Sequence, residues 1–208
     1  MENKSGKIIA VIGAPRSGKS FLAGLLAGHY NGKIILEGEE IDFPERICED
    51  IEKNIRPLER ILWFRNKLVK EYLVAQEYKE KGETIILDVF WIGYQLFIDA
   101  LSNGFENDVL KDMAEVDRKT LDYPDVIIFL SVTEKSIRKF IKLGGRKFDN
   151  SEDYIINQAL PVNKLYHDFL EKNQHLFNKV ITIQRDSMDF SRAGDFQDIV
   201  QQIDSSLN

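Results

Sequence analysis

"IIAVIGAPRSGKSFLAGLLA" occupies residues 8–27 and joins an apolar run, a glycine-bearing break and a second apolar stretch at helical spacing. Glycine lets the backbone of such a break curl, so that several N–H groups converge on one anion. The following helix presents its N-terminus to the same anion. The stretch predicts a strand, a phosphate-holding loop and a helix, in that order.

The break itself has the spacing Gly13-x4-Gly18-Lys19-Ser20, which fits the Walker A pattern. In that pattern the lysine reaches the β- and γ-phosphates of a nucleotide, and the serine hydroxyl ligates Mg²⁺. We therefore expect ATP and Mg²⁺ as cofactors. The predicted nucleotide-binding residues are Gly13, Ala14, Pro15, Arg16, Ser17, Gly18, Lys19 and Ser20.

Composition restricts the class of protein. The chain has 208 residues, of which 43% are hydrophobic and 30% charged, and this predicts one globular domain over residues 1–208. A net charge of −6 argues against a nucleic-acid partner. No apolar run is long enough to span a membrane. The lone Cys48 and the absence of a secretory signal favour a cytoplasmic protein. The three histidines have no ligand spacing, so no zinc site is expected.

Short β-rich runs alternate with longer helical patterns along the chain. Most of the strands are apolar on both faces, as in a parallel sheet covered on both sides. We predict a three-layer α/β/α P-loop fold with a five-stranded, mostly parallel sheet. The strands are expected at 7–13, 33–37, 83–90, 124–132 and 179–184, and the main helices at 19–30, 57–81, 92–103, 133–142 and 151–174.

The other motifs of P-loop proteins narrow the activity. A GTPase carries Asp-x-x-Gly after its third strand and Asn-Lys-x-Asp later, whereas "DVFW" follows the third strand here and "NKLY" occupies 163–166. Motor-type and AAA-type ATPases are usually longer. Small size and the basic segment "KLGGRKF" (142–148), which is lid-like, favour a kinase of a small metabolite.

The order of the remaining segments resembles the deoxynucleoside kinase family and its relatives, the thymidylate kinases. An acidic residue follows strand two in "IILEGEE", a long helix leads to "IILDVF", and "YPDVIIFLSVTEKSIRKFI" precedes the basic lid at about 142–152. The chain closes with "VITIQRDSMDFSRAGDFQDIVQQI", similar to the family's last strand, base-contacting loop and final helix. The resemblance implies phosphoryl transfer from ATP to a nucleoside hydroxyl, and helix-mediated homodimers.

The chain also departs from the family's pattern. Val89 stands where the family has an arginine after the acid, and Gly38 where it has a proline. The lid arginines correspond to Phe140, Gly144 and Arg146, so that one of three remains. These losses leave open a nucleotide-binding subunit without catalysis, or hydrolysis without an acceptor.

Four residues are the predicted catalytic groups: Lys19, Glu37, Asp88 and Arg146. Glu37 is the candidate base for an acceptor hydroxyl, against a solvated acidic turn. Asp88 is the candidate partner of Ser20 in binding Mg²⁺, against a helix N-cap. Arg146 is the candidate clamp on the transferred phosphoryl group, against an exposed charge run.

Two further pairs are predicted to contact ligands. Asp189 and Phe190 are expected at the adenine base through the family resemblance, against a simple turn. The resemblance also implies that Trp63 and Lys70 lie at the acceptor, near the positions of the glutamine and arginine that line the family's nucleoside pocket, and an indole on a cationic helix face suits a base. The alternative for that face is ordinary solvation. If this face lines the acceptor site, an aromatic residue among cations suits a nucleotide better than a neutral nucleoside, so a nucleoside monophosphate remains the alternative acceptor.

Overall fold

The computed structural model describes residues 6–38, 43–143 and 152–207. Its centre is a five-stranded sheet of order β2-β3-β1-β4-β5, in which every neighbouring pair is parallel. Each strand coincides with a predicted one, although β2 and β3 are shorter than expected. The strands are β1 (Lys7–Gly13), β2 (Lys33–Ile35), β3 (Thr84–Leu87), β4 (Val126–Ser131) and β5 (Val180–Gln184).

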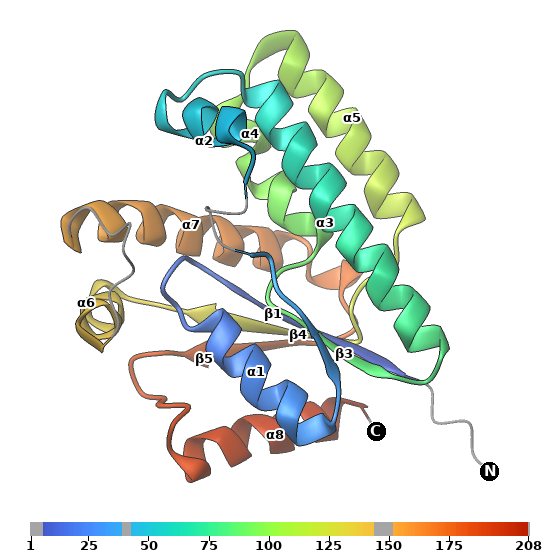
Figure 1. Cartoon of the computed structure of the whole chain (residues 1–208), viewed down its shortest axis with the longest axis vertical. Helices are drawn as coiled ribbons and strands as arrows, with labels where there is room; N and C mark the ends of the chain where they lie inside the picture. Colours follow the sequence, from blue (N-terminus) through green and yellow to red (C-terminus); the bar gives the residue numbers. More distant parts are fainter. Residues whose placement is uncertain (1–5, 39–42, 144–151, 208) are drawn as a thin grey trace.

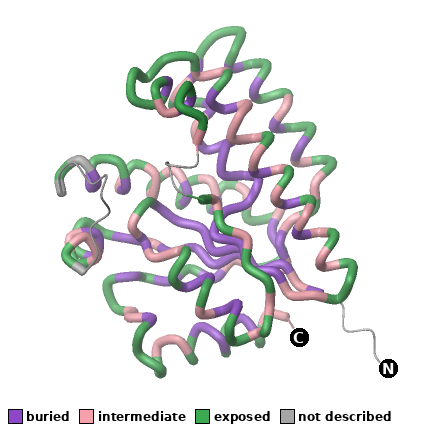
Figure 2. The backbone as a smooth tube through the Cα atoms, viewed as in Figure 1, coloured by how far each residue is buried: buried purple, intermediate pink, exposed green. Residues whose placement is uncertain are grey.

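Helices cover both faces of the sheet and confirm the three-layer prediction (Figure 1). One face packs against α1 and α8, and the other against α3, α7 and the 3₁₀ segment η2. The central strands β1, β3 and β4 are buried almost throughout, whereas the edge strands β2 and β5 are partly exposed (Figure 2). The bounds are α1 (Lys19–Tyr30), α3 (Pro57–Glu80), η2 (Trp91–Phe97), α6 (Glu134–Leu143), α7 (Glu152–Lys172), η3 (Gln174–Leu176) and α8 (Ala193–Leu207).

The expected single helix at 92–103 is wrong in detail. The chain forms η2 and then the short α4 (Ile98–Leu101). Residues 91–96 are all buried, and Gly93 lies so close to its neighbours that an added Cβ would be 3.1 Å from Val89 Cγ2. A segment buried on every side lacks the single apolar face that identifies a surface helix.

Two helices were not expected. These are α2 (Glu45–Glu52) and α5 (Gly104–Thr120). Helix α5 packs beside α3, on the outer side of the layer that α3 forms (Figure 1). The inner face of α5 combines Leu110 and Ala114 with the polar Asn107 and Asp117. Exposed Phe105 and Val116 lie elsewhere on the helix, so its hydrophobic pattern predicts no clear core face.

The fold places the expected site residues at one edge of the sheet. In a parallel sheet the carboxyl ends of all strands share an edge, and ligands bind there. The phosphate loop follows β1, and Asp88 directly follows β3, which pairs with β1. Most of the predicted lid at about 142–152, including Arg146, lies outside the described residues. Within the described ranges, no helix combines the length and apolarity that crossing a membrane requires.

Candidate phosphate and metal site at the carboxyl edge of the sheet

The loop after β1 has the backbone that its glycines predict. Gly13 has φ +151°, and an added Cβ would lie 2.8 Å from the Leu130 carbonyl oxygen. Gly18 has φ +93° and is the N-cap of α1. Between them, the Ser17 N–H closes a turn by donating to Ala14 O at 3.2 Å. A side chain at either glycine would strain the loop, so the spacing of the motif follows from the backbone.

The interior of this loop has unused hydrogen-bonding capacity. Ser17 is fully buried, and its hydroxyl has no hydrogen-bond partner within the described part of the chain. The Gly18 N–H likewise contacts no acceptor among those residues. The ammonium group of Lys19 lies over the loop and donates to Ala14 O at 3.3 Å. A cation and free backbone donors around a curled loop fit the phosphates of a nucleotide.

Ser20 and Asp88 come together across the sheet edge. The Ser20 hydroxyl donates to Asp88 Oδ2 at 2.7 Å, although 68 residues separate them. The other carboxylate oxygen of Asp88 accepts the Glu37 N–H at 2.7 Å. Asp88 is 4% exposed. A hydroxyl and a buried carboxylate are oxygen ligands of the kind that Mg²⁺ prefers, so the residues present fit the predicted metal.

Glu37 completes this group from the end of β2. Its side chain is half-buried, and burial raises the pKa of its carboxyl above the ordinary value. The charge of Lys19 opposes this rise and that of Asp88 adds to it, so both groups act on Glu37 electrostatically. A carboxylate with a raised pKa beside a phosphate loop is chemically suited to accept a proton.

Lys67 belongs to the predicted cationic face of α3, together with Arg56, Arg60 and Lys70, but the sequence prediction gave it no individual role at the site. Its ammonium group donates to the Glu37 carbonyl oxygen and forms an ion pair with Glu71 at 2.7 Å. The predicted cationic face of α3 is thus only partly a ligand surface. Arg56 pairs with buried Asp50, and the guanidinium of Arg60, itself buried, donates to backbone and amide oxygens.

The two predicted acceptor-binding residues on α3 differ in surroundings. Trp63 is half-buried and packs edge-on against Phe43 and Phe64, at ring-centroid distances of 5.0 and 4.9 Å. Lys70 is exposed, and among the described residues it forms no hydrogen bond or ion pair with the other predicted site residues. Only Trp63 belongs to an aromatic cluster at the segment that joins β2 to α3.

The predicted base-binding pair is also divided. Phe190 is 3% exposed and belongs to the core between the sheet and α8. Asp189 accepts hydrogen bonds from the backbone and hydroxyl of Ser191, and the hydroxyl contributes most to a lowered pKa of its carboxyl. The face of Phe190 is covered by the guanidinium of Arg185, a residue that the sequence prediction did not single out.

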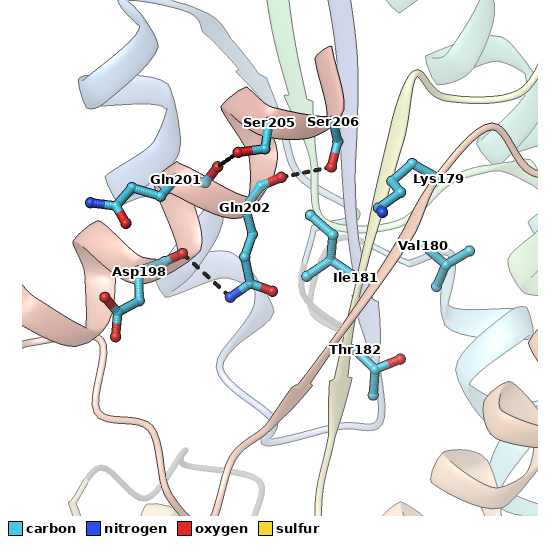
Figure 3. Close-up of a pocket in the computed structure, with 9 residues that line it drawn as sticks. All are labelled: Lys179, Val180, Ile181, Thr182, Asp198, Gln201, Gln202, Ser205 and Ser206. Carbon is cyan, nitrogen blue, oxygen red and sulfur yellow. Dashed lines mark hydrogen bonds between the residues drawn. The ribbon is translucent and has the colours of Figure 1, made fainter. Parts of the chain in front are cut away.

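A separate cavity of about 570 Å³ lies between β5 and α8 (Figure 3). Three of its polar lining residues, Ser205, Ser206 and Gln202, donate to backbone carbonyls of α8. None of the predicted site residues lines it. The chemistry therefore favours the carboxyl edge of the sheet as the functional site. Among the described residues, no three histidine, cysteine, aspartate or glutamate side chains gather as a metal site.

Comparison with known proteins adds to this geometry. No protein-family model and no curated protein sequence matches the chain. Solved structures do match it. Deoxyadenosine kinase from M. mycoides with bound dATP has a TM-score of 0.73 at 19% identity, over 95% of this chain and 99% of that one. The same enzyme with dCMP and dCDP gives 0.73 at 17% identity and the same coverage. Thymidylate kinase from Candida albicans gives 0.64 at 18% identity, over 98% and 94% of the two chains.

The chain shares the fold of these kinases. The predicted resemblance to the deoxynucleoside and thymidylate kinases is confirmed at the level of the fold, and it covers nearly the whole chain. Val89, at the position where the resemblance led us to expect an arginine, is buried in a cluster with Leu68 and Tyr94. That position contributes to the core here and supplies no charge to the site.

Proposed function

We propose that this protein is a P-loop kinase that transfers the γ-phosphoryl group of ATP to the 5′-hydroxyl of a deoxynucleoside or nucleoside. The observation that carries the proposal is the linkage of Ser20, Asp88 and Glu37 at the mouth of the phosphate loop. Binding of a nucleotide alone would need the loop and Lys19. Transfer to a hydroxyl also needs a base, and Glu37 supplies a carboxylate at the end of β2, where its backbone N–H donates to Asp88.

Each residue then has a defined task. Backbone N–H groups of the loop and the Lys19 ammonium bind the phosphates and offset their charge. Ser20 and Asp88 would hold Mg²⁺, which supplies charge stabilisation to the phosphate oxygens when bound. Glu37 accepts the proton of the acceptor hydroxyl while the hydroxyl oxygen forms a bond to the γ-phosphorus. The bond between that phosphorus and the bridging oxygen breaks, and ADP leaves.

The aromatic cluster of Trp63 and Phe43 supports an acceptor that carries a base. Phe43 lies on the chain segment that connects Glu37 to α3, Trp63 lies on α3 itself, and Lys67 joins that helix to Glu37. A ring stacked near this cluster would place the attached sugar towards Glu37. The M. mycoides enzyme of the same fold is named as a deoxyadenosine kinase, which agrees with such an acceptor.

The test is ADP formation from Mg-ATP with a panel of nucleosides and nucleoside monophosphates. Acceptor-dependent ADP formation is expected with at least one nucleoside, with a loss of about 10²–10⁴-fold in kcat for Glu37→Gln. Lys19→Ala should lose nucleotide binding. Two exposed residues provide matched controls, Glu77→Gln on α3 and Lys135→Ala on α6, and both should retain the rate.

Other outcomes would redirect the proposal. A response only to nucleoside monophosphates would move the acceptor from a hydroxyl to a phosphate. Lys19-dependent ATP binding with no acceptor response would show a nucleotide-binding protein without transfer to these substrates.

A further inference from the structure

Arg185 is a buried cation behind the phosphate loop. It follows β5 directly, and its backbone N–H donates to Ser131 O of β4 at 2.9 Å. The residue is 5% exposed, and burial lowers the pKa of its guanidinium to about 10, so it remains charged at neutral pH. Burying a charge is costly unless it is compensated, so the partners of this side chain reveal its purpose.

Two aromatic rings hold the guanidinium. Its central carbon lies 3.5 Å from the ring centroid of Phe190 and 4.5 Å from that of Phe140. Nε donates to the Ser17 carbonyl oxygen at 2.9 Å, and one terminal nitrogen donates to Met188 O at 2.7 Å. The rings restrict the plane of the guanidinium, and the two carbonyls fix its rotation within that plane.

The bond to Ser17 has a consequence on the other side of the peptide. The Ser17 carbonyl and the Gly18 N–H belong to one planar trans peptide, so they point in opposite directions. A donor that fixes the carbonyl from outside the loop therefore fixes the N–H towards its inside. Gly18 needs such a restraint, because glycine is the residue with the most backbone freedom, and its N–H finds no acceptor within the described residues.

We propose that Arg185 is a positioning residue of the phosphate loop, which holds the Ser17–Gly18 peptide so that the Gly18 N–H points at a bound phosphate. The inference rests on the proposed nucleotide binding, and it assigns the strength of that binding in part to a residue 168 positions away. The buried charge also adds a positive potential behind the loop, where water screens it little.

This arrangement bears on the missing lid arginines. Phe140 occupies a position that corresponds to an arginine in the resembling family. In this chain the guanidinium that lies against that position comes from Arg185, which follows β5. Phe140 therefore carries no charge of its own, and its ring packs against the charged guanidinium of Arg185.

The peptide itself can be observed by NMR. The sequence contains only two Ser–Gly steps, Ser5–Gly6 and Ser17–Gly18. Protein labelled with ¹³C-carbonyl serine and ¹⁵N-glycine therefore gives two correlated signals. In nucleotide-free Arg185→Lys and Arg185→Met protein, the Ser17–Gly18 signal should shift and the other should stay. Arg192→Met, an exposed arginine of the same loop, should leave both unchanged. An unmoved Ser17–Gly18 signal in both Arg185 variants would overturn the proposal.

Affinity supplies the second test, with inorganic tripolyphosphate and ATP as probes. Loss of a charge-assisted hydrogen bond should weaken both by about 10- to 100-fold in Arg185→Met, with a smaller loss in Arg185→Lys. Equal losses for the two probes are expected, since Arg185 acts through the phosphate loop. A loss for ATP alone would place Arg185 at the base and overturn the proposal. Lower thermal stability with unchanged affinity would show a merely structural role. If the unaltered protein binds neither probe, the proposed function fails first, whatever the NMR signal does.

Discussion

Asp88 joins two segments that lie far apart in the sequence, because one of its oxygens accepts the Ser20 hydroxyl at 2.7 Å and the other accepts the Glu37 N–H at 2.7 Å. The first contact fixes the start of α1, and the second fixes the end of β2. A single buried carboxylate thereby sets the spacing between the phosphate loop and the candidate base. Ser20, Glu37 and Asp88 were predicted from three separate motifs, and the Asp88 carboxylate contacts both of the other residues.

Asp88→Asn should weaken Mg²⁺ binding while it keeps the hydrogen bond that holds Glu37 in place. Asparagine is isosteric and retains an oxygen that can accept the Glu37 N–H, but it lacks the charge that favours Mg²⁺. We expect kcat to fall at least about 100-fold, since metal stabilisation of a phosphoryl transition state is worth several kcal/mol. Nucleotide affinity measured in EDTA, where no Mg²⁺ is bound, should stay within about threefold of the unaltered protein. A change of that size is under about 1 kcal/mol. An unchanged kcat at saturating Mg²⁺ would remove Asp88 from the metal site.

Lys67→Met should affect the acceptor step more than nucleotide binding. The Lys67 ammonium holds the Glu37 carbonyl to α3, so its removal frees the end of β2 and misplaces the candidate base. Misplacement of a reacting group by a fraction of an ångström is expected to lower kcat by about tenfold or more. The dissociation constant for ATP should not change.

Lys53→Met is the matched control for Lys67. It removes another lysine that pairs with a glutamate four residues away, on the exposed surface of α2 at 3.0 Å. Such exposed pairs contribute little, so kcat should be unaffected. Equal losses in the two variants would mean that the Lys67 effect is not transmitted through Glu37.

The residues that sequence reasoning found and missed differ in how local their signals are. The phosphate loop is encoded by contiguous residues, and the buried strands by short apolar runs, so both were predictable. Arg185 and Lys67 act on Ser17 and Glu37 through contacts between distant segments. No spacing in the sequence encodes such contacts. The "QRDSMDF" segment holds one signal for Arg185, a cation directly after an apolar strand, but only the fold shows which carbonyl it binds.

The loss of stability at acid pH should depend on protonation of the Asp50 carboxyl. Hydrogen bonds from Arg56 hold the pKa of the Asp50 carboxyl below its usual value of 3.8, and this side chain is buried. A carboxyl whose pKa is lower in the folded state stabilises the fold above its unfolded pKa, and the contribution is lost as pH falls through the folded value. Urea unfolding should therefore show a steeper loss of stability as the pH falls below about 4 in the unaltered protein than in Asp50→Asn. Parallel profiles would contradict the assignment.

Arg65 and Asp117 connect α3 to α5, the helix that the sequence did not predict. The Asp117 side chain is 2% exposed, and it accepts the Arg65 Nε–H at 2.8 Å and the Tyr94 hydroxyl at 2.6 Å. Arg65→Met leaves a buried carboxylate without its cation, which should cost about 3–5 kcal/mol of unfolding free energy. Arg65→Met combined with Asp117→Leu removes both charges, so we expect a large part of that loss to be recovered.

Urea denaturation of these variants shows whether stability depends on the Arg65–Asp117 ion pair itself or on the cost of leaving Asp117 charged and unpaired. Arg118→Met is a suitable control, because it removes an arginine of α5 that donates to Gln95 and pairs with exposed Glu115. It should cost about 1 kcal/mol or less. If the double variant is as unstable as Arg65→Met alone, the pair holds α5 in place by its specific geometry. In that case an apolar contact cannot replace it.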